Sequence, residues 1–145
     1  MYQRILVPVD GSALTERAIQ ASIGLAQQLG AAITGFVTAQ CPSAGRARAH
    51  AKPQAVDEED ALTPAHAREV LERFAAAAQA AGVPFEGHHV QVEHIDEALL
   101  AEAEGRGCDL IVMVTEGRGP FGEFLYGSQT KAVLSGSKLP LLVLH

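Results

Sequence analysis

Aromatic and basic residues are both scarce in this sequence. Aromatic side chains make up 5% of the 145 residues and tryptophan is absent, so the chain offers little for stacking nucleic-acid bases. The 11 Lys and Arg residues face 17 Asp and Glu residues, which leaves a formal net charge of -6. An acidic chain does not favour binding to nucleic-acid phosphates or to anionic lipids. We therefore expect neither nucleic acid nor a membrane as a partner, and we favour a small ligand.

Cysteine and long hydrophobic runs are also lacking. The 2 cysteines, Cys41 and Cys108, are far apart and form no C-x-x-C pair, which excludes a disulfide scaffold or a zinc knuckle as the basis of the fold. No segment approaches the roughly 18 apolar residues of a membrane helix, and the first residues lack the apolar core of a secretory signal. We expect a cytoplasmic protein in a reducing compartment.

The chain does have the composition of a globular protein. Hydrophobic residues make up 48% of it and charged residues 19%. A chain of this length has room for one buried core. We expect a single domain that spans residues 1–145.

Short apolar runs alternate with helical patterns along the chain. The expected strands are residues 4–9, 31–38, 84–92, 109–114 and 141–144. Helices are expected from Ser12 as N-cap to a stop at Gly30, from Thr63 as N-cap to about 81, over 95–104 with a stop at Gly105, and over about 127–134. Residues 41–62 mix charges and prolines, which predicts a long loop.

Strict alternation of strands and helices predicts an α/β fold. We expect a doubly wound, five-stranded, mainly parallel sheet with helices on both faces. The strand over 84–92 contains Pro84 and Gly87, which favours a place near an edge of the sheet.

Ligands of such sheets bind at the carboxyl ends of the strands. Asp10 ends the first strand, and Gly11 and Ser12 follow at the start of a helix, where free N–H groups can meet a polar ligand. The same residue types also cap helices without binding anything. The spacing alone leaves both interpretations open.

A second turn, residues 117–128, is rich in glycine. Backbone amides at Gly117, Gly127 and Ser128 can approach a phosphate closely, and Arg118 can add charge-assisted hydrogen bonds. The alternative is a loop whose glycines only turn the chain.

Four segments together resemble the universal stress protein family over nearly the whole chain. They are RILVPVDGS at 4–12, CDLIVM at 108–113, GSQTKAVL at 127–134 and KLPLLVL at 138–144. The resemblance implies a Rossmann-like fold of the adenine nucleotide alpha hydrolase type, a homodimer and a role in stress responses. Many members bind ATP or a related nucleotide through the motif G-x2-G-x9-G-[S/T].

This motif is met in part. Gly117, Gly127 and Ser128 match its last three positions, whereas its first glycine falls on Val114. The resemblance implies that the three matching residues contact phosphates, that Asp10 lies near the ribose or adenine, and that Val37 lies beside the adenine.

Two residues just before this turn oppose the binding of a nucleotide. Val114 is β-branched and resists glycine-like backbone angles. Glu116 brings a negative charge near the place of a triphosphate.

Two functions therefore stay open. The first is a regulatory protein that binds ATP, with or without magnesium, in a homodimer paired through its C-terminal strand. The second is a dimeric interaction module that has lost the nucleotide. Catalysis is less favoured, because no G-x-S-x-G elbow, Walker lysine or H-E-x-x-H occurs, and it would amount at most to slow ATP hydrolysis or autophosphorylation. We expect no metal site, since His88 and His89 would point to opposite faces of a strand.

Overall fold

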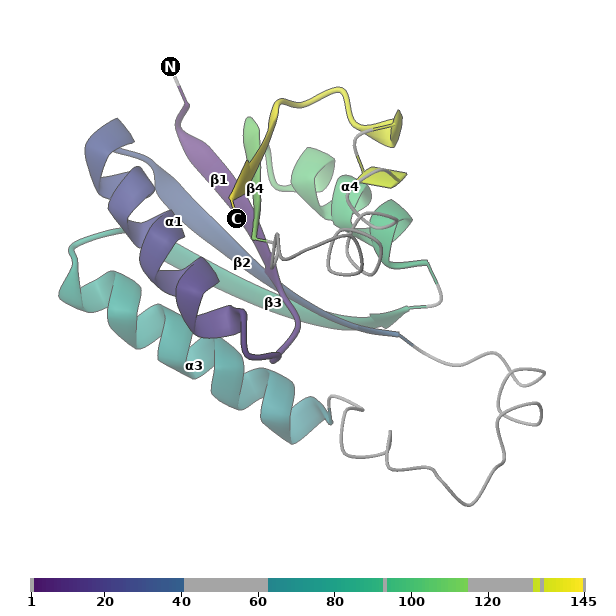
Figure 1. Ribbon diagram of the computed structural model, residues 1–145, viewed down its shortest axis with the longest axis horizontal. Coiled ribbons are helices and arrows are strands. Elements are labelled where there is room, and N and C mark those ends of the chain that lie inside the picture. Colours follow the sequence, from purple (N-terminus) through teal and green to yellow (C-terminus); the bar gives the residue numbers. More distant parts are fainter. Residues whose placement is uncertain (1, 41–62, 93, 115–131, 134, 145) are drawn as a thin grey trace.

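The computed structural model describes residues 2–40, 63–92, 94–114, 132–133 and 135–144. Strands and helices alternate along these ranges (Figure 1). The elements are β1 (Arg4–Val9), α1 (Thr15–Leu29), β2 (Ala32–Gln40), α3 (Pro64–Ala80), β3 (Phe85–Val92), α4 (Ile95–Gly105), β4 (Leu110–Val114) and β5 (Leu141–Leu144). Residues 132–133 and 135–136 are also helical.

The five strands form one parallel sheet in the order β3-β2-β1-β4-β5. The predicted doubly wound α/β fold is confirmed. β1 lies at the centre, and the strand order reverses between β1 and β4, since β2 follows on one side and β4 on the other. The expected edge position of residues 84–92 is also confirmed, because β3 ends the sheet.

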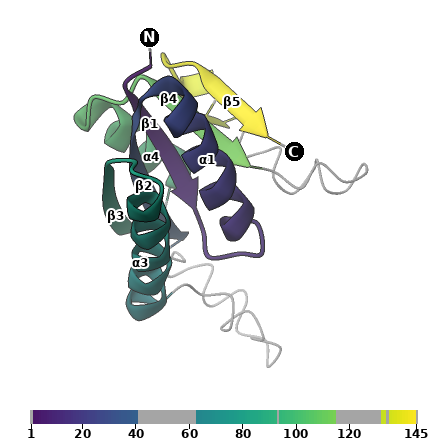
Figure 2. The same ribbon diagram turned by 90° about the vertical axis from the view of Figure 1, so that its left-hand side faces the viewer.

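Helices cover both faces of this sheet (Figures 1 and 2). Side chains alternate along each strand, so neighbouring residues enter different cores. On the face covered by α1 and α3, the core includes Ile5, Val7, Ile33, Val37, Val112, Ile19, Val70 and Phe74. On the face covered by α4, it includes Leu6, Phe36, Ile111, Leu99, Ala103 and Val133. Burial of both faces explains why β1 and β4 are apolar at almost every position.

The expected N-cap at Ser12 is wrong. Helix α1 begins at Thr15, and Leu14 is its N-cap. The Ser12 hydroxyl accepts the Leu14 N–H at 3.3 Å, and the Ser12 carbonyl accepts the Thr15 N–H at 3.0 Å. Ser12 therefore closes a turn before the helix, because its short side chain bonds to nearby backbone.

The other helix ends agree better with the sequence. Thr63 caps α3, since its Oγ1 accepts the His66 N–H at 3.1 Å. Gly30 stops α1 in the left-handed conformation, with φ at 66°. The expected stop at Gly105 is wrong, because α4 includes it and Gly107 takes the left-handed turn, with φ at 69°.

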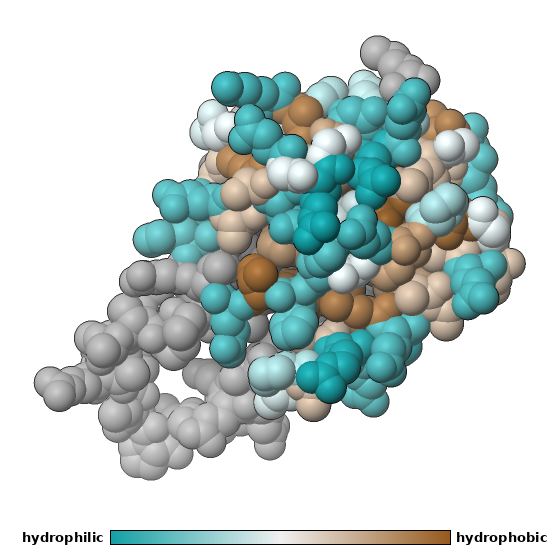
Figure 3. Space-filling view, turned by 180° about the vertical axis from the view of Figure 1, so that it is seen from behind, coloured by the Kyte–Doolittle hydropathy of each residue, from teal (hydrophilic) through white to brown (hydrophobic). Residues whose placement is uncertain are grey.

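Two expectations concern parts of the chain that the structure does not describe. The loop predicted for 41–62 lies outside the described residues, as does most of the helix predicted for 127–134. Among the described residues, no helix combines the length and the apolar character needed to cross a membrane. The face seen from behind in Figure 3 carries hydrophilic side chains across its middle, with apolar side chains between them.

Gly35 in β2 makes room for an aromatic contact between β3 and α3. A Cβ at this position would lie 2.7 Å from Cζ of Phe85 and 3.3 Å from Cδ2 of Phe74. These two rings pack with their centroids 4.7 Å apart. The absence of a side chain at Gly35 thus lets the Phe85 ring lie over the strand backbone.

We expect Gly35→Ala to destabilise the protein by about 1–3 kcal/mol, because the added methyl group must displace the Phe85 ring. Chemical denaturation followed by circular dichroism measures this. The control is Gly24→Ala in α1, where a Cβ would meet nothing within 4 Å. That change should stabilise by about 0.5–1 kcal/mol, as expected for glycine in a helix interior. Equal stability of Gly35→Ala and wild type would contradict the packing described.

Candidate functional site

The carboxyl ends of three strands meet at one edge of the sheet. Val9 at the end of β1 pairs with Val37 in β2. Between β1 and β4 the register is Ile5 with Leu110 and Leu6 with Ile111, and the same offset aligns Val9 with Val114. In doubly wound sheets, ligands bind at this edge beside the reversal of strand order. Here the reversal lies between β1 and β4.

Pro8 ends the pairing of these two strands. The Gln3 carbonyl accepts the Ala32 N–H of β2, so the even-numbered residues of β1 direct their backbone groups toward β4. Residue 8 is proline and has no N–H to donate. The β1–β4 pairs accordingly end at Leu6 with Ile111, although both strands continue. The two strands are thus unpaired where the candidate site begins.

Asp10 lies at the end of β1 and is exposed. Its Oδ1 accepts the Ser12 N–H at 2.9 Å, and Gly11 between them has φ at 79°. This is an Asx-type turn that fixes the carboxylate at the sheet edge. Within the described part of the chain, Oδ2 makes no hydrogen bond. Among the described residues, nothing occupies this second carboxylate oxygen of Asp10.

Val37 and Val114 flank this carboxylate from the neighbouring strands. Val37 is 1% exposed and belongs to the core under α1 and α3. Its side chain packs on the face of the sheet that α1 and α3 cover. Val114 is half-buried and packs against the same core. No described residue other than glycine has a positive φ, so Val114 keeps an ordinary strand backbone.

Thr15 adds a polar group at this edge that we did not predict from the sequence. It begins α1, is 2% exposed, and its hydroxyl has no hydrogen-bond partner among the described residues. Helical side chains lean toward the amino end of their helix, which directs Thr15 toward the carboxyl edge of the sheet. Four residues predicted for the site, Gly117, Arg118, Gly127 and Ser128, lie outside the described residues.

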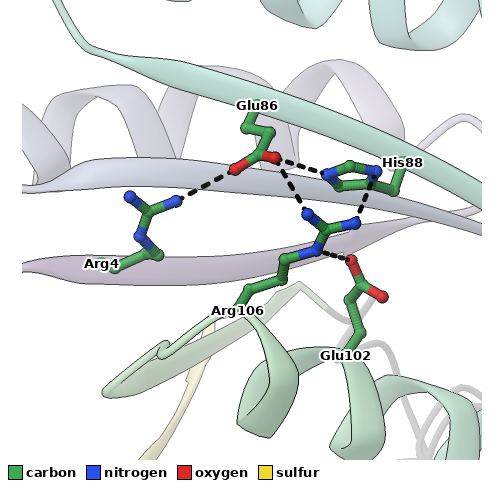
Figure 4. Close-up of polar contacts among 5 residues, drawn as sticks. All are labelled: Arg4, Glu86, His88, Glu102 and Arg106. Carbon is green, nitrogen blue, oxygen red and sulfur yellow. Dashed lines mark hydrogen bonds and ion pairs between the residues drawn. The ribbon is translucent and has the colours of Figure 1, made fainter.

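A second polar cluster lies at the opposite end of the sheet and also escaped the sequence analysis. Arg4, Glu86, His88, Glu102 and Arg106 form a network of ion pairs and hydrogen bonds (Figure 4). It joins the starts of β1 and β3 to the end of α4. The spacing of Glu102 and Arg106 is a helical i, i+4 pair that the sequence shows, but only the topology brings it to Glu86.

The described histidines and Cys108 show no arrangement that indicates catalysis or metal binding. His88 bonds within the network whereas His89 is exposed, in agreement with their expected opposite orientations. Among the described residues, no group of three or more His, Cys, Asp or Glu is placed to hold a metal ion. Burial raises the pKa of the Cys108 thiol, with the Thr34 hydroxyl beside it acting in the other direction. A thiol of this kind is protonated at neutral pH and a poor nucleophile.

The order of the strands and the polar edge at their reversal define a doubly wound α/β protein with a candidate ligand site between β1 and β4. The sequence model of the universal stress protein family matches residues 1–145. The chain belongs to this family.

Curated relatives are similar over most of their length. A universal stress protein of Thermus aquaticus is 33% identical over 149 residues, which cover 100% of both chains. One from Methanocaldococcus jannaschii is 28% identical over 145 residues, which are 99% of this chain and 82% of the relative.

Solved structures share the fold. A universal stress protein crystallised with cAMP is 25% identical and has a TM-score of 0.69, with 99% of this chain and 97% of the other covered. The Archaeoglobus fulgidus protein in complex with dAMP is 18% identical and has a TM-score of 0.62, with 99% and 98% covered. At that identity, the likeness concerns the fold alone.

We expect Pro8→Ala to extend the pairing of β1 with β4, because it supplies the missing N–H on the side of β4. The new amide should be protected from hydrogen exchange, as measured by NMR. The control is Pro64→Ala in the first turn of α3, where a backbone N–H has no partner in the helix. That amide should exchange quickly. Fast exchange of the amide introduced by Pro8→Ala would show that the strands separate for another reason.

Proposed function

We propose that this chain binds ATP or a related adenine nucleotide as a regulatory ligand between the carboxyl ends of β1 and β4. The observation that carries the proposal is the fixed Asp10 carboxylate at the point where Pro8 separates these strands, with one oxygen that makes no hydrogen bond to a described residue. Family membership supports it, since relatives have been solved with cAMP and dAMP.

The roles follow from the chemistry of each group. A carboxylate accepts hydrogen bonds, so Asp10 suits a ribose hydroxyl or an adenine amino group and repels phosphate. The phosphates then belong on the glycine turn, with the amides of Gly117, Gly127 and Ser128 and the guanidinium of Arg118. Magnesium would offset the charge that the acidic chain presents to a triphosphate.

We propose that Val37 lies beside the adenine. It is part of the apolar core at the sheet edge, next to the strand that carries Asp10. The whole site would come from the single domain of residues 1–145.

A second candidate is a dimeric interaction module without a nucleotide. It is favoured by Val114, which keeps an extended backbone and packs into the core where the family motif has glycine. A side chain at this place occupies space that a glycine would leave to the ligand.

We expect isothermal titration with ATP and magnesium to show saturable binding. Asp10→Asn should weaken it about 10-fold or more, since a hydrogen bond to a charged group contributes about 1.5–3 kcal/mol. The control is Glu104→Gln, the same loss of charge at an exposed position near the end of α4, away from this edge. Its affinity should equal that of wild type. Absence of saturable heat at ~1 mM ATP would exclude the nucleotide proposal.

The variant Val114→Gly separates the two candidates. If the natural chain binds nucleotide, this variant should bind at least as well, because the backbone gains freedom and the side chain is removed. Binding by the variant alone would mean that the natural chain has lost the ligand and would support the interaction module.

We also propose that β5 forms a homodimer. Each of its four residues, LLVL, is half-buried, and within the described chain β5 pairs only with β4. An apolar edge strand with open backbone groups is a template for pairing with another strand. A twofold axis would bring the β5 strands of two copies together.

We expect Val143→Lys to convert the dimer to a monomer, because a charge on this edge opposes burial against a second copy. Sedimentation velocity gives the mass, and circular dichroism verifies folding. The control is His89→Lys on β3, the other edge of the sheet, which should leave the mass unchanged. A dimeric Val143→Lys protein would place the interface elsewhere.

A further inference from the structure

The polar network between β3 and α4 is centred on a histidine with two different partners. His88 Nε2 lies 3.0 Å from Glu86 Oε1, and His88 Nδ1 lies 3.2 Å from an Nη2 atom of Arg106 (Figure 4). Arg106 caps the end of α4 and also reaches Glu86 Oε1 at 3.1 Å and Glu102 Oε1 at 3.0 Å. Arg4 holds the second oxygen of Glu86 at 3.2 Å.

These contacts determine the protonation of His88. A guanidinium donates hydrogen bonds and cannot accept them. Nδ1 of His88 must therefore accept from Arg106, which means that this nitrogen carries no proton. The single ring proton is then on Nε2 and is donated to Glu86. The geometry thus fits only the neutral ring in its Nε2–H form.

A second proton would change one of the two contacts. With Nδ1 protonated, the positively charged imidazolium N–H of His88 would face the positively charged guanidinium N–H of Arg106. Neither group could accept, so the hydrogen bond with Arg106 would be lost. The contact with Glu86 would be kept, now as an ion pair. Histidine is the side chain that gains or loses charge in the physiological range.

The surroundings keep the two partners charged throughout. His88 contacts Glu86 on its own strand and Arg106 from α4. These two groups are paired in turn with Arg4 from β1 and Glu102 from α4. The hydrogen bond from His88 and the charges of Arg106 and Arg4 lower the pKa of Glu86, with partial opposition from desolvation. Glu86 thus stays ionised over the pH range in which histidine side chains generally change charge.

We propose that His88 is a proton-operated clasp between the edge strand β3 and the end of α4. When neutral it accepts a hydrogen bond from Arg106, which gives Arg106 a second contact with β3 beside its ion pair with Glu86. When protonated it keeps Glu86 and loses the contact with Arg106. Arg106 directly precedes the left-handed turn at Gly107 that leads into β4. Acidification would thus weaken the attachment of the end of α4 to β3, while the ion pair of Arg106 with Glu86 is kept.

The first test reads the ring directly. Two-bond ¹⁵N–¹H NMR spectra of the wild-type protein at ~pH 7.5, above the ordinary histidine pKa of about 6.5, should show the His88 proton on Nε2. They should also show a hydrogen-bonded Arg106 side chain whose signals shift as His88 titrates. A proton on Nδ1 at this pH, or an Arg106 signal that does not follow the titration of His88, would overturn the proposal.

The second test is a double-mutant cycle between His88→Ala and Arg106→Met, with unfolding in urea at ~pH 7.5 and ~pH 5.5. The two side chains are partly exposed, so we expect a favourable coupling of roughly two- to fivefold in the unfolding constant at the higher pH. At the lower pH it should vanish or reverse. The matched control is the cycle of His89→Ala with Arg106→Met, which should show no coupling at either pH. A coupling of His88 with Arg106 that is equal at both pH values would overturn the clasp.

Discussion

The central strand β1 is the constraint on which the rest of the structure depends. It is buried on both faces, so its residues must alternate between two cores, and helices must cover the sheet on both sides. The chain meets this demand by placing α1 and α3 under one set of side chains and α4 under the other. Pro8 then interrupts the pairing with β4 near the carboxyl end. The same strand therefore determines both the layers of the fold and the position of the candidate site.

Much of this architecture could be predicted from the sequence, because it depends on local patterns. Runs such as residues 4–9 and 109–114 are short, mostly apolar and bounded by turn residues, which favours strands covered on both faces. The stop at Gly30 and the cap at Thr63 depend on single residues whose conformational preferences are strong. Ser12 misled the prediction, because the same hydroxyl can cap a helix or close the turn before it. The prediction at Gly105 failed because the left-handed conformation that follows α4 is adopted by Gly107 instead.

The site was predictable only in part. Asp10 could be found because strand ends are visible in the sequence and parallel strands bring their carboxyl ends together. The effect of Pro8 requires knowing which neighbour its backbone faces, and that follows from pairing with β2. In the polar network, Glu86 bonds to Arg106, which is 20 residues away in the chain, and to Arg4, which is 82 residues away. No local sequence pattern shows contacts over such separations. Such contacts depend on strand order, which the sequence does not state.

The length of β1 separates the two polar ends of the molecule. Arg4 belongs to the network at the amino end, and Asp10 follows the carboxyl end. A strand of six residues rises about 20 Å, which is more than twice the screening length of about 8 Å at physiological ionic strength. A change of charge at one end of β1 therefore has little electrostatic effect on groups at the other end. Communication between proton uptake at His88 and a ligand at Asp10 would therefore need a movement of the structure between them rather than a direct effect of charge.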